Sequence, residues 1–177
     1  MREFKIVNEF KEKEINLPKR ETKHAAGYDF ECAEEVVVHS IFKLFTKNIH
    51  SFLFDTKKEE YQSMKPTIVK TGIKADMMED EYLMICSRSS NPLKFGLLLS
   101  NSLGIIDKDF FENERDDGHI RFAFWNLFPF DFTIKKGQRI GQGIFQKFLL
   151  TNNDNATGER NGGLGSSWVY CRTISGE

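Results

Sequence analysis

The chain is short of the features that mark several classes of protein. No stretch approaches the roughly 18 uninterrupted apolar residues that a membrane helix needs, and the start, Met1 to Lys5, has no apolar signal-peptide core. The three cysteines are odd in number and match no zinc spacing with the four histidines, which argues against a disulfide framework or a zinc centre. The formal net charge is -1, so the chain does not have the excess of basic residues that is typical of proteins that bind nucleic acid through its backbone. We therefore expect a protein of the reducing cytoplasm, without a membrane or nucleic-acid partner.

Short apolar runs separated by turn signals are what the chain does contain. Its 177 residues, 40% hydrophobic and 29% charged, are typical of one soluble globular domain spanning residues 1–177. The runs are Tyr82–Cys86, the aromatic-rich Ile120–Trp125, and Ile140–Leu150, which two glycines interrupt. The turn signals between them are Asn91-Pro92, Asp117-Gly118 and Lys136-Gly137. Many short strands with this punctuation predict an all-β sandwich or barrel.

Two regions depart from the strand pattern. In residues 40–64, Ile41, Phe45, Ile49 and Phe52 follow a helical spacing, so we expect a helical or irregular insertion, which caps the sheet in its simplest interpretation. The stretch from residue 151 towards the C-terminus is polar and rich in glycine. Such a segment cannot bury enough apolar surface to order itself, and we expect an arm that is mobile until something binds it.

Polar residues that could carry chemistry are grouped in five segments. They are 26–30, which contains Asp29, then 87–91, 101–110, 135–142 and 160–167. In the second, Arg88 with Ser89 and Ser90 directly follows a predicted strand, and a guanidinium beside hydroxyls and backbone amides makes a phosphate cradle. A solvated loop is the competing interpretation.

The third segment brings two carboxylates close together in sequence. If it forms a hairpin, Asp107 and Asp109 lie at alternate positions and point the same way, so that one of them could serve as a general base. An acidic hairpin tip without a chemical role is the alternative. In the fourth segment, Gln142 is better placed to reach inward than the solvated lysines before it.

The fifth segment is rich in glycine and carries one arginine, Arg160. It is not a Walker loop, because no Gly-Lys-Ser/Thr follows, and it is not a dinucleotide fingerprint, because no βαβ unit fits in the remaining residues. Its amides, hydroxyls and arginine suit a flexible arm that closes over a phosphate.

In this order the five segments resemble the five motifs of the trimeric dUTPases, above all Arg88-Ser89-Ser90 followed by Asn101 and Gly104-Ile105-Ile106-Asp107. The resemblance implies a jelly-roll-like subunit, a homotrimer with active sites between subunits, and magnesium-dependent hydrolysis of dUTP to dUMP and pyrophosphate. It implies that Asp107 activates the attacking water and that Asp29 helps to hold Mg²⁺ through water. The substrate-binding residues that it implies are Arg88, Ser89, Ser90 and Gln142 on the phosphates, Asn101, Leu103, Gly104 and Ile106 on uracil, Phe110 on the deoxyribose, and Arg160, Gly163, Leu164, Gly165, Ser166 and Ser167 in the closing arm.

Several residues depart from the family pattern. Phe110 stands where tyrosine is usual, Leu164 replaces a common aromatic, and Trp168 replaces a usual glycine. Gln138 occupies a position where aspartate is common, and the segments 40–64 and 111–119 are longer than in compact members. The pattern is similar to dUTPases of Gram-positive bacteria and their phages.

Two other functions remain open at this stage. A dCTP deaminase shares the fold and a similar Arg-Ser-Ser motif, but the glutamate that it requires is replaced by Ala123, which can transfer no proton. A dUTPase-like protein could instead serve mainly to bind a regulatory protein, with the aromatic and charged insertion 40–64 as its surface.

Overall fold

The computed structural model describes residues 1–46 and 65–158. Strands dominate this part of the chain: β1 (Glu3–Ile6), β2 (Tyr28–Glu31), β3 (Val36–Val38), β4 (Thr67–Lys70), β5 (Ile73–Asp76), β6 (Glu81–Ser87), β7 (Leu97–Leu99), β8 (Leu103–Asp107), β9 (Arg121–Asn126), β10 (Phe132–Ile134) and β11 (Arg139–Lys147). The helical elements η1 (Asn8–Phe10), α2 (Ser90–Phe95) and η3 (Lys108–Phe110) are short. The predicted all-β class is confirmed, and the three predicted apolar runs coincide with β6, β9 and β11.

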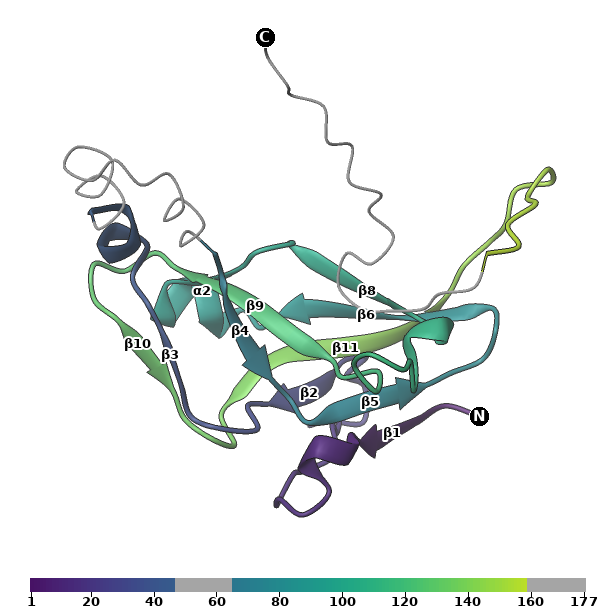
Figure 1. The fold of residues 1–177 in the computed structure, drawn as a ribbon, viewed down its shortest axis with the longest axis horizontal. Helices are drawn as coiled ribbons and strands as arrows, with labels where there is room; N and C mark the ends of the chain where they lie inside the picture. The colour runs from purple at the N-terminus through teal and green to yellow at the C-terminus, as the bar shows by residue number, and fades with distance from the viewer. Residues whose placement is uncertain (47–64, 159–177) are drawn as a thin grey trace, which may run out of the picture.

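The strands pair antiparallel in four small sheets (Figure 1). One has four strands in the order β2-β11-β6-β8, and one has three in the order β4-β9-β7. The pairs β1-β5 and β10-β3 complete the set. Because sequence neighbours such as β7 and β8 belong to different sheets, the chain crosses repeatedly between layers, as in a sandwich rather than a simple meander.

The core lies between these sheets and is rich in phenylalanine. Alternation along the strands places Leu83 and Ile85 of β6 on the inner side, together with Phe122 and Phe124 of β9, all at most 3% exposed. Phe30 of β2 is fully buried and joins the same cluster. Burying such a side chain stabilises the fold by roughly 1.5–3 kcal/mol. These buried residues therefore determine which side of the four-stranded sheet faces the core.

The start of the predicted insertion is helical. Residues 41–46 form a helix, and the Ser40 hydroxyl accepts a hydrogen bond from the Phe42 N–H at 3.2 Å. Residues 47–64 lie outside the described part of the chain. Phe45, which the helical spacing assigns to an apolar face, is 52% exposed, and Phe42 is 55% exposed. Ile41, the first residue of the predicted face, is partly buried, and the cap itself stays a prediction.

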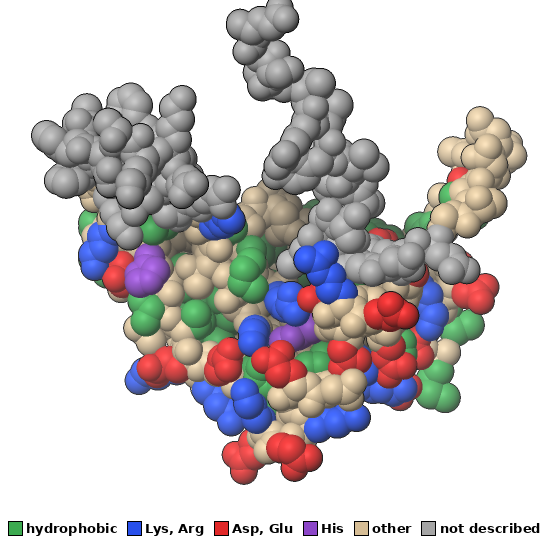
Figure 2. Space-filling model, viewed as in Figure 1, with side chains coloured by type: hydrophobic (Ala, Val, Ile, Leu, Met, Phe, Trp, Pro, Cys, Tyr) green, Lys and Arg blue, Asp and Glu red, His purple; other side chains and the backbone are tan. Residues whose placement is uncertain are grey.

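The surface carries charges of both signs. Figure 2 shows lysine and arginine side chains interspersed with aspartate and glutamate over the lower part of the face, around β1 and β5. No helix in residues 1–46 and 65–158 is long and apolar enough to cross a membrane.

Candidate functional site

The candidate site is built on the outer side of the four-stranded sheet. Residues directly opposite one another in an antiparallel ladder point to the same side of the sheet. The strand register defines three transverse rows of such residues on this outer face: Asp29, Gln142, Cys86 and Leu103; then Ile144, Met84 and Ile105; then Gln146, Tyr82 and Asp107. The face is therefore polar at two ends and apolar between them.

Asp29 is the centre of the first polar end. Its side chain is only 5% exposed, and its oxygens meet three donors, two from β11 and one from the segment that follows β6. Gln142 Nε2 donates a hydrogen bond to Asp29 Oδ1 at 3.0 Å. The Arg88 Nε atom lies 3.3 Å from the same oxygen, and Arg139 Nη1 lies 3.2 Å from Oδ2. One carboxylate thus holds two guanidinium groups close together in this Asp29 cluster (Asp29, Arg88, Arg139 and Gln142), and the half-exposed Glu21 also pairs with Arg139 at 3.0 Å.

Two glycines let the strands approach closely enough to form the Asp29 cluster. The register of β11 against β2 shifts between Arg139 and Gly141, which is a β-bulge. A Cβ atom at Gly141 would lie 2.0 Å from the Phe122 ring, so no larger residue fits there. A Cβ atom at Gly27 would lie 3.1 Å from the Gln142 side chain. These glycines fix the path of β11 past Asp29.

A buried amide holds the Arg88 segment against β11. Asn91, in the first turn of α2, is 2% exposed. Its Nδ2 donates to the Ile140 carbonyl oxygen at 2.7 Å and to Ser87 Oγ at 3.1 Å. The two bonds join the end of β6 to the start of β11. They hold the backbone next to Arg88 close to the backbone that leads to Gln142.

An open cleft of about 630 Å³ adjoins the Asp29 cluster. Its lining residues include Arg88, Ser90, Arg139, Lys19 and Lys94. Ser89, at the N-cap of α2, is exposed beside them. Two carboxylates, Glu21 and Glu31, line the same cleft, but the four cations outnumber them, and the net positive charge suits an anionic ligand.

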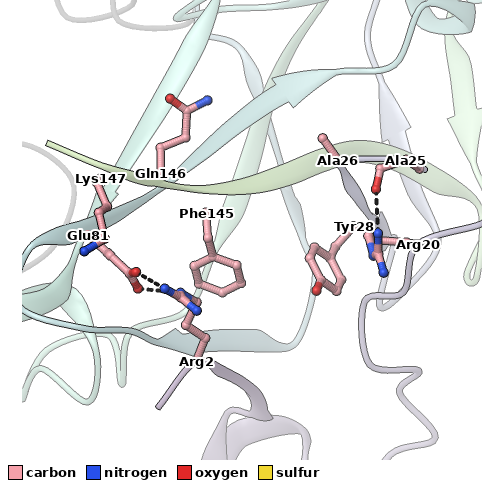
Figure 3. Close-up of a pocket in the computed structure, with 9 residues that line it drawn as sticks. All are labelled: Arg2, Arg20, Ala25, Ala26, Tyr28, Glu81, Phe145, Gln146 and Lys147. Atoms are coloured by element: carbon pink, nitrogen blue, oxygen red, sulfur yellow. Dashed lines mark hydrogen bonds and ion pairs between the residues drawn. The ribbon is translucent and has the colours of Figure 1, made fainter. Parts of the chain in front are cut away.

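A second cavity, of about 330 Å³, also has arginines at its rim, but both are held by partners of their own chain (Figure 3). Arg2 forms an ion pair with Glu81, whose side chain is 2% exposed. Arg20 donates to the carbonyl oxygens of Lys23 and Ala25 at 3.1 and 3.0 Å. Figure 3 shows Phe145 and Tyr28 between the two arginines. This cavity is therefore a less suitable phosphate site than the cleft beside the Asp29 cluster.

Asp107 marks the other polar end of the outer face. It is exposed, ends β8, and lies opposite Tyr82, whose hydroxyl donates to Gln146 Oε1 at 3.3 Å. Four residues along β11 and three interstrand spacings separate the two aspartates, which places the Cα atoms of Asp29 and Asp107 about 20 Å apart. One chain does not bring them into a single site.

Residues 101–110 do not form a hairpin, which was the condition for Asp107 and Asp109 to point the same way. β7 pairs with β9 and β8 pairs with β6, so the two strands belong to different sheets. Asp109 lies in η3 rather than in a strand, because the chain turns into a 3-10 helix directly after Asp107. The alternation argument for two carboxylates pointing the same way therefore does not apply.

The remaining predicted residues of this segment lie along β8 and η3. Asn101 precedes the strand, and Leu103, Gly104 and Ile106 lie within it. A Cβ atom at Gly104 would lie 2.5 Å from Ile85, so the strand approaches β6 too closely for a side chain there. Phe110 is 6% exposed, and its carbonyl oxygen accepts a 2.7 Å hydrogen bond from Asn113 Nδ2.

Some of the predicted site falls outside the described residues. This applies to the predicted arm residues Arg160, Gly163, Leu164, Gly165, Ser166 and Ser167. Within residues 1–46 and 65–158, no group of three or more His, Cys, Asp or Glu side chains could hold a metal ion by itself.

Arg139 is the member of the Asp29 cluster to which the sequence assigned no role. Arg139 and Gln142 are three positions apart, and strict alternation would put them on opposite faces of the strand. The bulge next to Gly141 brings both to Asp29. Glycine inside a strand pattern is the signal that could have indicated the bulge.

Comparisons with known proteins agree on one family. The family model described as dUTPase matches residues 53–168. The deoxyuridine 5'-triphosphate nucleotidohydrolase of Lactococcus lactis is 37% identical over 169 residues, covering 94% of this chain and 97% of the relative. The crystal structure of dUTPase from Streptococcus mutans is 34% identical, with a TM-score of 0.67 over 84% of this chain and 98% of that chain.

A more distant structure shares the fold. It is a dUTPase mutant from phage phi11 of S. aureus, 15% identical with a TM-score of 0.62, covering 88% of this chain and 96% of that chain. That protein coordinates a structural Mg(II) ion.

Proposed function

The chain belongs to the dUTPase family, and from that premise we propose which of its residues carry out the hydrolysis of dUTP to dUMP and pyrophosphate. The Asp29 cluster and the cleft beside it bind the triphosphate. Asp107 activates the water molecule that attacks the α-phosphate. The observation that carries the proposal is the separation of these two groups on one sheet face, because it requires the site to be completed by a second copy of the chain.

The Asp29 cluster suits the phosphates because its charge is positive and its donors are held in place. Asp29 neutralises only part of the charge of Arg88 and Arg139, and it keeps both guanidinium groups oriented. A guanidinium donates paired hydrogen bonds that match the oxygens of a phosphate. Gln142 and the hydroxyls of Ser89 and Ser90 add neutral donors beside them. Arg160, Gly163, Leu164, Gly165, Ser166 and Ser167 remain the residues that we expect to close over the bound substrate.

Asp107 is suited to activate water because it lies exposed at the end of an edge strand. In the proposed step, the water oxygen forms a bond to the α-phosphorus as its proton passes to the Asp107 carboxylate. The bond from the α-phosphorus to the bridging oxygen breaks, and pyrophosphate leaves with those electrons. A general base of this kind contributes about 10²–10⁴-fold to the rate.

The described residues suit Mg²⁺ only when the phosphates of the substrate supply further ligands. A carboxylate has about four acceptor sites, and three protein donors already approach Asp29, so it would hold the ion through a water molecule. Mg²⁺ keeps several waters and binds through few carboxylates plus substrate phosphates. When bound, the ion supplies neutralisation of the phosphate charge.

The edge position of β8 supports a role in reading uracil. In the order β2-β11-β6-β8, only one side of β8 is paired within the described sheet. On the other side every second residue of an edge strand turns both its N–H and its C=O outward, and uracil, which has carbonyl and N–H groups of its own, can pair with such a residue. We assign this recognition to the backbone of Leu103, Gly104 and Ile106 with the Asn101 side chain. Phe110 then packs against the deoxyribose and leaves no space for a ribose hydroxyl.

A homotrimer completes the site in this proposal. The apolar middle of the outer face includes Ile105, 52% exposed, and the adjacent Leu103 is 50% exposed. The described residues after β11 project away from the body (Figure 1), and Leu149 is 97% exposed. Apolar side chains of this size at the surface are suited to contacts between copies. Asp107 of one copy would then meet the Asp29 cluster of another.

Mixing two inactive variants tests the proposal. Asp107→Asn removes the base and Arg88→Ala removes a phosphate contact, so each homo-oligomer should release little pyrophosphate from dUTP. After joint refolding, hybrids contain sites with an intact Asp107 from one subunit and an intact Arg88 from another, and activity should return. If the hybrids stay inactive while wild-type protein refolded in the same way is active, the shared site is wrong.

A protein-binding role for the insertion is a second candidate. Phe42 and Phe45, at its start, are 55% and 52% exposed, which marks a surface able to bind another protein. Deleting residues 47–64 should then leave dUTP hydrolysis intact and abolish co-purification of a regulatory protein. A cytoplasmic location is part of the proposal. It is supported by the described cysteines, Cys32 and Cys86, which are both free thiols, as a reducing compartment would keep them.

A further inference from the structure

Lys74 is a buried charged residue outside the site described above. It lies in β5 and is 4% exposed. Its Nζ atom donates to Glu112 Oε1 at 2.9 Å and to Asp117 Oδ1 at 2.7 Å. Burial acts to lower the pKa of Lys74, but the bonds to the two carboxylates outweigh it and raise that pKa above the ordinary value. Lys74 is therefore a cation at neutral pH that binds two carboxylates at once.

Both partners of Lys74 lie in the loop 111–119, which begins immediately after Phe110. Glu112 and Asp117 each have a φ angle of 53°, in the left-handed region that residues with a side chain rarely adopt. Such a backbone conformation is strained and persists only where its surroundings impose it. The ion pairs with Lys74, together with a 2.6 Å hydrogen bond from the Asn8 N–H to Asp117, supply that constraint.

η3, and Phe110 with it, is fixed from both sides, on one side by the loop. On the C-terminal side, Asn113 donates to the Phe110 carbonyl oxygen, and the Phe111 ring lies 5.3 Å from Lys74 Nζ. On the N-terminal side, Lys108 forms an ion pair with Asp76, in the same strand as Lys74. The backbone that carries Asp107 and Phe110 is thus fastened to β5 before and after Phe110.

We propose that Lys74 is a positioning residue that sets the selectivity for deoxyribose over ribose, by holding the loop 111–119 so that Phe110 presses against C2' of the sugar. This inference rests on the proposed role of Phe110. Lys74 itself does not touch the substrate. Its effect comes through the loop geometry, because a ring displaced by a fraction of its width leaves space for one hydroxyl group.

Lys74→Met tests the inference, because methionine keeps an apolar stem of similar length without the charge. We expect kcat/KM for dUTP divided by kcat/KM for UTP to fall about tenfold, a change typical for the loss of steric discrimination of one small group. Lys74→Arg, which keeps the cation, should restore part of the ratio. A lower Tm with an unchanged dUTP/UTP ratio would mean that Lys74 stabilises the fold without affecting selectivity, and would overturn the proposal.

Two further variants keep the test decisive. Glu112→Gln removes one partner that is 54% exposed, so it should fold even if Lys74→Met does not, and it should lower the ratio in the same direction by a smaller factor. If Lys74→Met does not fold and Glu112→Gln leaves the ratio unchanged, the proposal fails. Lys70→Met is the matched control, since it removes lysine ion pairs with Glu9 and Glu34 but none with the loop, and should leave the ratio at the wild-type value.

Phe110→Ala separates this inference from the proposed function. If Phe110→Ala leaves the dUTP/UTP ratio unchanged, the role of Phe110 in sugar selection is wrong, and the inference fails with it. If Phe110→Ala lowers the ratio while Lys74→Met and Glu112→Gln do not, the role of Phe110 stands and the inference alone is overturned.

Discussion

Two aspartates at opposite corners of one sheet face lie in contrasting surroundings. Asp29 is 5% exposed and meets two arginines and a glutamine of its own chain. Asp107 is exposed at the end of the edge strand β8, next to a 3-10 helix. A carboxylate surrounded by donors organises positive charge, whereas one at a sheet edge can approach another molecule. The two ends of the face therefore have different roles. A substitution at the exposed end should mainly lower turnover, and one at the buried end should lower stability and substrate binding.

The largest effect is expected at the exposed end. Asp107→Asn keeps the shape of the side chain but removes the proposed base, so turnover of dUTP should fall about 10²–10⁴-fold with little change in Tm. Steady-state pyrophosphate release and a thermal melt measure the two quantities. Asp109→Asn, two residues further in η3, is the matched control and should stay within a few-fold of wild type. If Asp109→Asn is the inactive variant instead, the two carboxylates have been assigned the wrong way round.

At the buried end, stability should suffer along with binding. Asp29→Asn leaves Arg88 and Arg139 close together without their shared carboxylate, and removing one partner of a buried ion pair costs about 3–5 kcal/mol. Because the arginine side chains are 26% and 39% exposed, water screens part of this, and we expect about 2 kcal/mol. Urea unfolding measures the loss, and KM for dUTP should rise.

Glu21→Gln sharpens the result at the buried end. Glu21 also pairs with Arg139, at 3.0 Å, but its side chain is 51% exposed, so its loss should change the free energy of unfolding by less than 1 kcal/mol. Equal losses for Asp29→Asn and Glu21→Gln would show that Asp29 has no special structural role.

The contrast also shows which parts of the molecule its sequence could predict. Local patterns predict the strands β6, β9 and β11, because each contains a short apolar run and turn dipeptides lie between the runs. These three predictions are confirmed. The register that brings Asp29 to Gln142 is a long-range property, because it depends on which strands pair and on the bulge at Gly141. The absence of a hairpin at residues 101–110 has the same long-range cause, because β8 pairs with β6 and not with a strand next to it in sequence.

His119 tests whether the body of the molecule can be weakened without touching either end of the sheet face. It is 2% exposed, and its Nε2 accepts a hydrogen bond from the Gly72 N–H at 2.9 Å, so the ring must be neutral at that nitrogen. Burial and the nearby Arg121 lower the pKa of His119 from 6.5 to about 4, although Glu9 and Asp116 oppose this and Lys70 adds to it.

The sign of the pH effect follows from that lowered pKa. Above pH 6.5 the histidine is neutral in both the folded and the unfolded state, and its contribution is fully present. Between pH 6.5 and about 4 the unfolded chain binds a proton that the folded chain rejects, so stability falls as the pH falls. From pH 7.5 to 5.5 the loss should be about 1 kcal/mol. His119→Gln, which can still accept a hydrogen bond from the Gly72 N–H, should flatten this slope in urea unfolding. A slope that survives in His119→Gln would assign the acid sensitivity to another group.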